Sequence, residues 1–203
     1  SPLYDKLSDV TEALFDKVIG LNLRGPFRLM SLVGERMQAS DGGAIVNVSS
    51  TGAVLKTPHA EPYGAAKAGL NKLTLSFAWA FGPDVRVNCI MPGPFLTDIS
   101  KAWDMDAFNA SAKSEFALQR GGEPNEIVSA VLYFASDASS YTTGAVLRVD
   151  GGSRSRRGIS RQRMRWRAPY LHLRAHATGV SLAPGSLPPY PGHPAAEHWS
   201  PVL

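Results

Sequence analysis

The 203-residue sequence predicts an α/β fold, a parallel sheet with helices packed on it. Three short apolar runs, 44–48, 85–91 and 145–149, are typical of strands that are covered on both faces. Longer segments with apolar residues at helical spacing stand before and between these runs. Strands that alternate with helices favour parallel pairing, because the chain returns to the sheet through a helix each time.

The first part of the chain is expected to form two helices before the first strand. Residues 7–18 show helical spacing, and Ser8 is a candidate N-cap. Residues 22–38 predict a longer helix that bends near its Gly-Pro pair. A turn at residues 41–43 then leads into the first strand.

The second part continues the alternation of helices and strands. Residues 63–81 predict a helix that is ended by Gly82 and Pro83. Residues 97–118 carry scattered apolar side chains and are expected to form a flexible stretch. Residues 124–136 predict the last helix, which precedes the third strand.

Composition excludes several classes of protein. Cys89 is the single cysteine and lies in an apolar run, so we expect an inert buried thiol and no disulfide framework. No apolar run reaches the length of a membrane span and no signal peptide opens the chain, which predicts a cytoplasmic protein. Asp104 and Asp106 have no His or Cys partners, so we expect a solvated face and no metal.

Positive charge is concentrated at the C-terminal end. Residues 1–152 carry 13 Lys and Arg against 16 Asp and Glu, whereas residues 153–203 carry 8 Arg, no Lys and 1 Glu. We therefore expect one domain over 1–152 and a disordered tail rich in Arg and Pro over 153–203. The abrupt change of composition favours out-of-frame translation of GC-rich DNA as the origin of this tail. A genuine disordered extension and an Arg-rich nucleic-acid arm stay open as alternatives, with the nucleic-acid arm least favoured.

Three residues suggest acid–base chemistry on an oxygen atom. Tyr63 and Lys67 stand four residues apart in a predicted helix, which places the phenol and the ammonium on one face. A positive charge beside a phenol favours its ionised form. Ser50, which precedes Tyr63 by 13 residues, offers a hydroxyl for a substrate oxygen. Tyr63 alone would be interpreted as a core or interface aromatic and Lys67 alone as a surface lysine, but the combination favours catalysis.

Several motifs occur in the order and spacing of one family. The Y-x-x-x-K pair with its upstream serine resembles the active site of the short-chain dehydrogenase/reductase family. Asn22-Leu23 resembles the family's N-L pair, and the resemblance extends over residues 1 to about 152. The other matching segments are G-A-I-V-N-V-S-S (43–50), V-R-V-N-C-I-M-P-G-P-F-L-T (85–97), R-G-G-E-P-N-E-I (120–127) and T-G-A-V-L-R-V-D-G-G (143–152).

The resemblance implies a partial Rossmann-type doubly wound parallel sheet, built from the C-terminal strands and helices only, and four catalytic residues. Tyr63 would be the general acid in ketone reduction and the general base in alcohol oxidation. Lys67 would stabilise the phenolate and bind the ribose hydroxyls, while Ser50 would orient the substrate oxygen. The backbone of Asn22 would hold a water near Lys67, although its side chain could also bond its own helix.

The resemblance also implies a nicotinamide cofactor, NAD or NADP. Pro92 and Gly93 would let the backbone approach the nicotinamide ring. The backbone of Phe95 would meet the carboxamide, and the Thr97 hydroxyl would reach the carboxamide or a phosphate. The complete set of expected cofactor contacts is Tyr63, Lys67, Pro92, Gly93, Phe95 and Thr97.

The phosphate-binding end of such a site is not found in this sequence. No G-x-x-x-G-x-G turn follows an apolar strand, and three strands fall short of the roughly six that a dinucleotide fold needs. We therefore expect the glycine-rich half of the domain to precede Ser1, which leaves NAD and NADP undistinguished. An alternative is a catalytically inactive fragment that binds nucleic acid or an acidic partner through its Arg-rich tail.

The lid expected over the site is apolar, which predicts an apolar carbonyl or alcohol as substrate. The same residues could instead pack the lid onto the core. The expected lid residues are Leu96, Ile99, Trp103, Met105 and Phe108. In its complete form the protein is expected to be a homodimer or homotetramer, as the resemblance implies.

Overall fold

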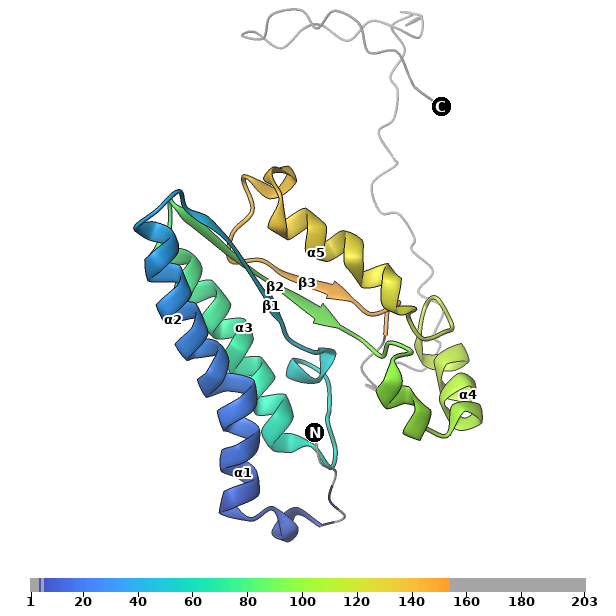
Figure 1. Ribbon diagram of the computed structural model, residues 1–203. Helices are drawn as coiled ribbons and strands as arrows, with labels where there is room; N and C mark the ends of the chain where they lie inside the picture. The colour runs from blue at the N-terminus through green and yellow to red at the C-terminus, as the bar shows by residue number, and fades with distance from the viewer. Residues whose placement is uncertain (1–3, 5, 154–203) are drawn as a thin grey trace, which may run out of the picture. The chain divides into compact units, whose positions relative to one another are not determined.

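A computed structural model describes residue 4 and residues 6–153 of the chain (Figure 1). From position 154 onward, the predicted disordered tail lies outside the described residues. The segment considered as a nucleic-acid arm lies outside them as well. Within the described ranges, no helix is both long and apolar enough to cross a membrane.

Three parallel strands form the sheet, as the sequence predicts. They are β1 (Gly43–Val48), β2 (Val85–Pro92) and β3 (Val146–Val149), in the order β1-β2-β3. Both pairings are parallel, and each strand agrees with its predicted run to within one residue at each end. The sheet confirms the α/β class and places the carboxyl ends of all three strands on the same edge.

Helices cover both faces of this sheet (Figure 1). On one face lie α2 (Gly25–Gln38) and α3 (Glu61–Phe81), and on the other lies α5 (Val128–Ala135). The central strand β2 is buried along most of its length, which is why its sequence is a nearly continuous apolar run. The doubly wound arrangement is confirmed for the described part of the chain.

The main core lies between the sheet and the helix pair α2 and α3. Its buried members are Met30, Leu70, Ala78, Phe81, Val85 and Val87. A polar contact crosses the same layer: Asn47 Nδ2 of β1 donates to Thr74 Oγ1 of α3 at 2.9 Å. Because the buried amide has its partner, the strand and the helix are held in a single register.

The first helix begins later than the sequence suggested. Its residues are α1 (Glu12–Ile19), and the Thr11 side chain caps it by accepting from the Leu14 N–H at 3.2 Å. Ser8 instead lies in a short 3-10 turn (Leu7–Asp9), so the prediction of Ser8 as the cap was wrong. Several cap-forming residues stand in this stretch, and helical spacing alone does not choose among them.

The bend expected in the second helix takes the form of a π-helical turn. This turn, Gly20–Arg24, joins α1 to α2 without a break in the helical path. Pro26 lies in the first turn of α2, directly after the π turn. The predicted start at Asn22 therefore falls inside the π turn, three residues before α2 begins.

Residues 97–118 are more regular than the sequence suggested. They contain a 3-10 turn (Asp98–Ala102) and α4 (Met105–Glu115), which Asp104 caps through the Ala107 N–H. The expectation of a flexible stretch was wrong because Trp103 and Phe108 pack against each other, with ring centroids 5.1 Å apart. The last helical segment is divided into a 3-10 turn (Pro124–Ile127) followed by α5.

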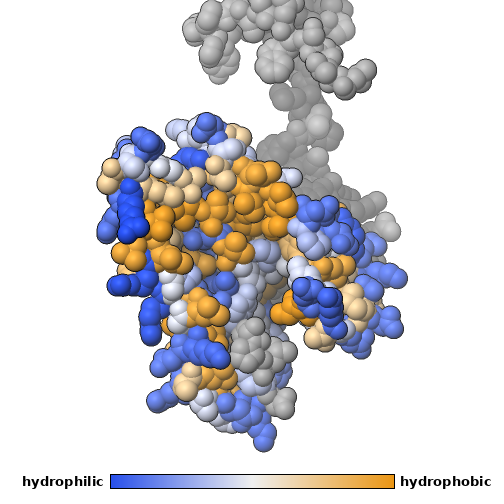
Figure 2. Space-filling view, in the orientation of Figure 1, coloured by the Kyte–Doolittle hydropathy of each residue, from blue (hydrophilic) through white to orange (hydrophobic). Residues whose placement is uncertain are grey.

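Strand β1 forms one edge of the sheet among the described residues, since only β2 pairs with it. Figure 2 shows apolar side chains gathered on this side of the molecule, over β1 and the neighbouring parts of α2 and α5. Val48, the last residue of β1, is 54% exposed. An apolar strand edge of this kind recruits other chains.

We expect a polypeptide of residues 1–203 to self-associate through this edge, and Val48→Lys to reduce the association because charged edge residues block strand pairing. Light scattering over a concentration series measures the effect. The matched control is Val54→Lys, since Val54 is 58% exposed but lies outside the sheet. Equal effects of the two lysines would attribute the change to net charge and refute the role of the edge.

Candidate active site

Helix α3 brings Tyr63 and Lys67 together at the carboxyl edge of the sheet. Lys67 Nζ lies 5.6 Å from the centroid of the Tyr63 ring, as the four-residue spacing predicts. Both side chains are half-buried. The ammonium group therefore lies beside the phenol, close enough to stabilise negative charge on it.

The Lys67 ammonium is also anchored to the sheet. Its Nζ donates to the carbonyl of Val48, the last residue of β1, at 3.0 Å. Burial lowers the pKa of this lysine, and the nearby Cys89 acts in the opposite direction. Cys89 itself is fully buried and unbridged, and burial raises the pKa of its thiol. The fixed position of Nζ makes Lys67 part of the site rather than a solvated surface residue.

The two serines after β1 have different environments. Ser49 is buried, and its hydroxyl donates to the carbonyl of Lys67 at 3.2 Å. Ser50 caps the following 3-10 turn (Thr51–Ala53), where its Oγ accepts from the Gly52 N–H at 3.1 Å. That bond leaves the Ser50 proton free to be donated elsewhere. The geometry therefore favours Ser50 over Ser49 as the residue that faces a substrate.

Ser50 and Tyr63 converge on one small region. A methyl group placed on Gly52 would lie 3.4 Å from Ser50 Oγ and 3.7 Å from Tyr63 Cε1. The serine hydroxyl and the edge of the phenol ring thus border the same space. The described structure brings three of the four predicted catalytic residues together.

Asn22 occupies a distinct position within the π turn. Its Nδ2 donates to the Val18 carbonyl at 3.0 Å, so the side chain bonds its own helix, as one of our two interpretations held. Among the described residues, no hydrogen bond joins Asn22 directly to Tyr63 or Lys67. π turns are frequent at functional sites, and a role in holding a water near Lys67 stays a prediction.

Four of the predicted cofactor contacts lie at the end of β2 and in the loop that follows: Pro92 ends the strand, and Gly93, Phe95 and Thr97 are in the loop. Its Gly93 N–H donates to the Val149 carbonyl at 2.9 Å, which ties the loop to the end of β3. A methyl group on Gly93 would lie 2.6 Å from Cβ of Asp150, so only glycine permits this approach. Farther along, Leu96 N–H donates to the Gly122 carbonyl at 2.8 Å.

An apolar groove of about 400 Å³ runs past this loop. It brings all four of these predicted contacts together with two residues of the expected lid, Ile99 and Trp103. Phe108 packs behind Trp103 and does not line the groove, and neither do Leu96 and Met105. The complete lining is Val48, Ile90, Pro92, Gly93, Pro94, Phe95, Thr97, Ile99, Trp103, Pro124, Ile127 and Val131.

The sequence reasoning missed the wall supplied by the last helical segment. Pro124, Ile127 and Val131 also line the groove. Ile127 and Val131 stand four residues apart and share a helical face, but which way that face turns depends on how the segment packs on the sheet, and the spacing does not show it.

The described side chains include no group of three or more His, Cys, Asp and Glu residues placed to hold a metal ion. Asp104, one of the two carboxylates considered in the sequence, serves as the N-cap of α4.

The residues present suit a nicotinamide dinucleotide at its nicotinamide end only. The glycine cradle at Gly93, the apolar groove and the exposed Thr97 side chain suit a flat ring that carries an amide. A site for a pyrophosphate needs a glycine-rich turn at a helix N-terminus, and the sequence contains no such motif.

A Ser–Tyr–Lys group at the carboxyl edge of a doubly wound parallel sheet is typical of dehydrogenases and reductases that use a nicotinamide cofactor. Comparison with known proteins supports the same class of enzyme. The family model described as enoyl-(acyl carrier protein) reductase matches residues 2–154. The chain belongs to the short-chain dehydrogenase/reductase family.

Individual relatives support the same assignment. The dehydrogenase/reductase SDR family member 4 of Homo sapiens is 34% identical over 77% of this chain, and an NAD-dependent glycerol dehydrogenase of Listeria innocua is 34% identical over 74%. The alignments cover 57% and 59% of these relatives, so the chain spans somewhat more than half of their length.

Solved structures of similar fold include proteins bound to NADH. A 4-hydroxyisoleucine dehydrogenase mutant complexed with NADH and succinate has a TM-score of 0.71 and 33% identity, covering 75% of this chain and 64% of that one. A 7α-hydroxysteroid dehydrogenase complexed with NADH and 7-oxo glycochenodeoxycholic acid has a TM-score of 0.68 and 32% identity, covering 71% of this chain and 57% of that one.

Proposed function

We propose that these residues form the catalytic part of an NAD(P)-dependent oxidoreductase that interconverts a carbonyl and an alcohol. The observation that carries the proposal is the convergence of Ser50, Tyr63 and Lys67, because Val48, whose carbonyl holds Lys67 Nζ, also lines the apolar groove. Each of the three supplies a different element of proton transfer, and the groove offers apolar contacts to the substrate around the reacting carbon.

Tyr63 is the acid and base of the proposed reaction. In reduction its hydroxyl gives a proton to the carbonyl oxygen, and in oxidation its phenolate takes the proton of the alcohol. Lys67, held by the Val48 carbonyl, stabilises the phenolate, while Ser50 donates its free proton to the substrate oxygen. A bound nicotinamide dinucleotide would supply or accept the hydride.

The cofactor proposal rests on the loop after β2 and on the relatives. Two similar structures are complexed with NADH, and residues 92–97 of this chain offer backbone groups and a hydroxyl beside the groove. The choice between NAD and NADP stays open. The residues that distinguish the two cofactors follow the second strand of a complete dinucleotide-binding sheet, and this sequence contains no segment that matches that strand.

The substrate and assembly proposals rest on apolar surface. The groove is lined almost entirely by apolar side chains, which suits an apolar carbonyl or alcohol. The outer faces of α2 and α3 expose apolar residues such as Phe27 and Trp79, and they suit a homodimer or homotetramer interface. No membrane partner is proposed, and a nucleic-acid partner is least favoured.

We expect the polypeptide of residues 1–203 to show no measurable binding of NADH, because its sequence lacks the phosphate-binding turn. A chimera in which a glycine-rich half from a relative precedes residue 1 should bind. Calorimetry and quenching of the four tryptophans measure both. Saturable micromolar binding by the polypeptide alone would contradict the expectation. Failure of the chimera to bind would favour the alternative of a catalytically inactive fragment.

A further inference from the structure

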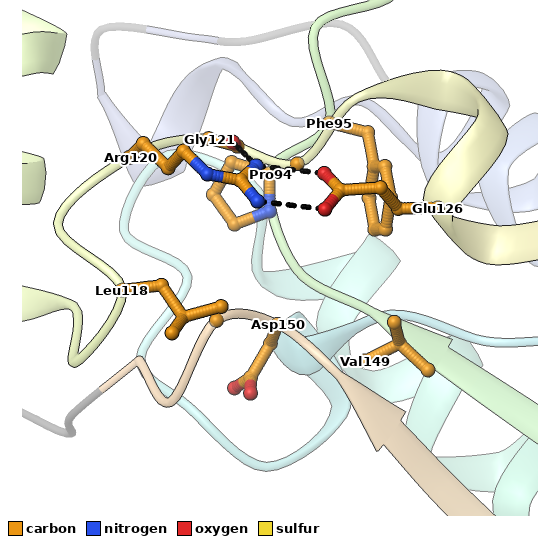
Figure 3. A pocket seen from close by; sticks show the side chains of 10 residues that line it. Pro94, Phe95, Leu118, Arg120, Gly121, Glu126, Val149 and Asp150 are labelled. Atoms are coloured by element: carbon orange, nitrogen blue, oxygen red, sulfur yellow. Dashed lines mark hydrogen bonds and ion pairs between the residues drawn. The ribbon is translucent and has the colours of Figure 1, made fainter. Parts of the chain in front are cut away.

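Three segments of the chain meet around a small pocket (Figure 3). They are the loop after β2, the segment from Leu118 to Gly122, and the turn after β3. Figure 3 shows Arg120 and Glu126 on the side of the pocket near Pro94 and Phe95. This pocket does not belong to the apolar groove, although both are bordered by Pro94 and Phe95.

Arg120 and Glu126 form a two-pronged ion pair. The two guanidinium nitrogens donate to the two carboxylate oxygens at 2.6 and 2.7 Å. Glu126 Oε2 also accepts from the Glu123 N–H at 2.7 Å, and Arg120 Nη1 also donates to the Gly121 carbonyl at 3.0 Å. The pair therefore closes residues 120–126 into a compact ring that is bonded to its own backbone.

This ring is bonded directly to the loop that faces the groove. Gly122 N–H donates to the Pro94 carbonyl at 3.0 Å, and the Gly122 carbonyl accepts from Leu96 N–H at 2.8 Å. The Phe95 ring lies against Gly122, where a methyl group would be 2.7 Å from ring carbon Cε1. Movement of residues 120–126 would thus displace the backbone on both sides of Phe95.

The chain enters this ring in an unfavourable conformation. Gln119 has a φ of +58°, in the left-handed region that residues other than glycine rarely adopt. Such a conformation persists only where surrounding contacts hold it. The ion pair begins at the next residue and is placed to supply that restraint.

We propose that Arg120 and Glu126 are positioning residues: their ion pair fixes residues 120–126, and through Gly122 it fixes the Phe95 backbone that recognises the nicotinamide carboxamide. The proposal rests on the proposed function for the identity of the ligand. It assigns the ion pair no contact with substrate or cofactor.

The side chains of the pair are 50% and 40% exposed, and exposed ion pairs usually contribute little. Two features distinguish this one, its bidentate geometry and the additional backbone bond to Glu126. The hydrogen bonds from Arg120, followed by that from the Glu123 backbone, lower the pKa of Glu126 to about 2. The carboxylate facing Arg120 therefore stays charged in neutral and mildly acidic solution.

Amide hydrogen exchange of the full 203-residue chain tests the positioning step without any cofactor. We expect Arg120→Met to raise exchange at Leu96 and Gly122 by about fivefold while leaving Val87 in the core unchanged. Arg120→Lys should give an intermediate value, because lysine keeps the charge but loses the bidentate bond. The matched control is Lys101→Met, which breaks a neighbouring exposed ion pair with Asp98. Unchanged exchange at Leu96 and Gly122 in Arg120→Met would overturn the proposal.

NADH titration of the chimera that carries a glycine-rich half tests the link to the ligand, since the 203-residue chain alone is expected not to bind this cofactor. We expect Arg120→Met to weaken its binding by about fivefold and Lys101→Met to leave it unchanged. Equal binding by both variants, despite faster exchange in Arg120→Met, would overturn the link. If the unaltered chimera does not bind NADH, the proposed function fails, and hydrogen exchange alone then decides whether the ion pair positions the loop.

Discussion

Tyr63→Phe is expected to lower turnover by about 10²–10⁴-fold in a chimera that binds cofactor, while leaving the affinity for NADH nearly unchanged. The substitution keeps the ring beside Lys67 and removes only the group that carries the proton. Steady-state rates with an apolar ketone, together with calorimetric titration of the cofactor, measure the two quantities separately.

Two further variants make this experiment specific. Tyr133→Phe is the matched control, because Tyr133 lies on α5 and its hydroxyl bonds Thr142 instead of facing the groove. Lys67→Ala should lower both turnover and cofactor affinity, since the lysine is proposed to serve both the phenolate and the ribose. Wild-type turnover in Tyr63→Phe would show that another group transfers the proton.

Leu70→Ala is expected to lower the free energy of unfolding by about 2–5 kcal/mol, because it leaves a cavity in the core between α3 and the sheet. Leu70 is 2% exposed and packs among the core residues of that layer. The control is Leu75→Ala on the same helix, which is 43% exposed and should change stability by less than about 0.5 kcal/mol.

Denaturant unfolding followed by circular dichroism measures both variants, and the slope of each transition shows whether unfolding stays cooperative. Equal destabilisation by the two substitutions would show that α3 does not pack on the sheet as described. The stability of a domain is only about 5–15 kcal/mol, so Leu70→Ala removes a large part of it.

The parts of the structure that follow from local periodicity could be predicted from the sequence. Strand β2 is covered on both faces, and that environment requires a continuous apolar run, which identifies the strand directly. Tyr63 and Lys67 meet because residues four apart share a helical face. Their pairing with Ser50 depended on the family spacing, because a contact between a loop and a helix leaves no periodic signal.

Other parts depend on contacts that a single sequence does not display. The cap of α1 lies at Thr11 because the chain before it turns, and cap propensity alone rates Ser8 as highly. Helix α4 was missed because its order comes from an aromatic cluster and from the Asp104 cap. The groove wall at Ile127 depends on how α5 packs on the sheet, which is a tertiary property.

Strand β1 and helix α3 exchange hydrogen bonds at the site in opposite directions. The Lys67 side chain bonds the backbone of β1 at Val48, and the Ser49 side chain bonds the backbone of α3 at Lys67. Successive side chains of a strand point to opposite faces, so a slip of β1 by one residue would bring Ser49 or Thr51 into the place of Ser50. The slip would also move the Val48 carbonyl away from Nζ. A misaligned sheet would therefore lose the anchored ammonium, which makes catalytic competence a direct report of correct strand alignment.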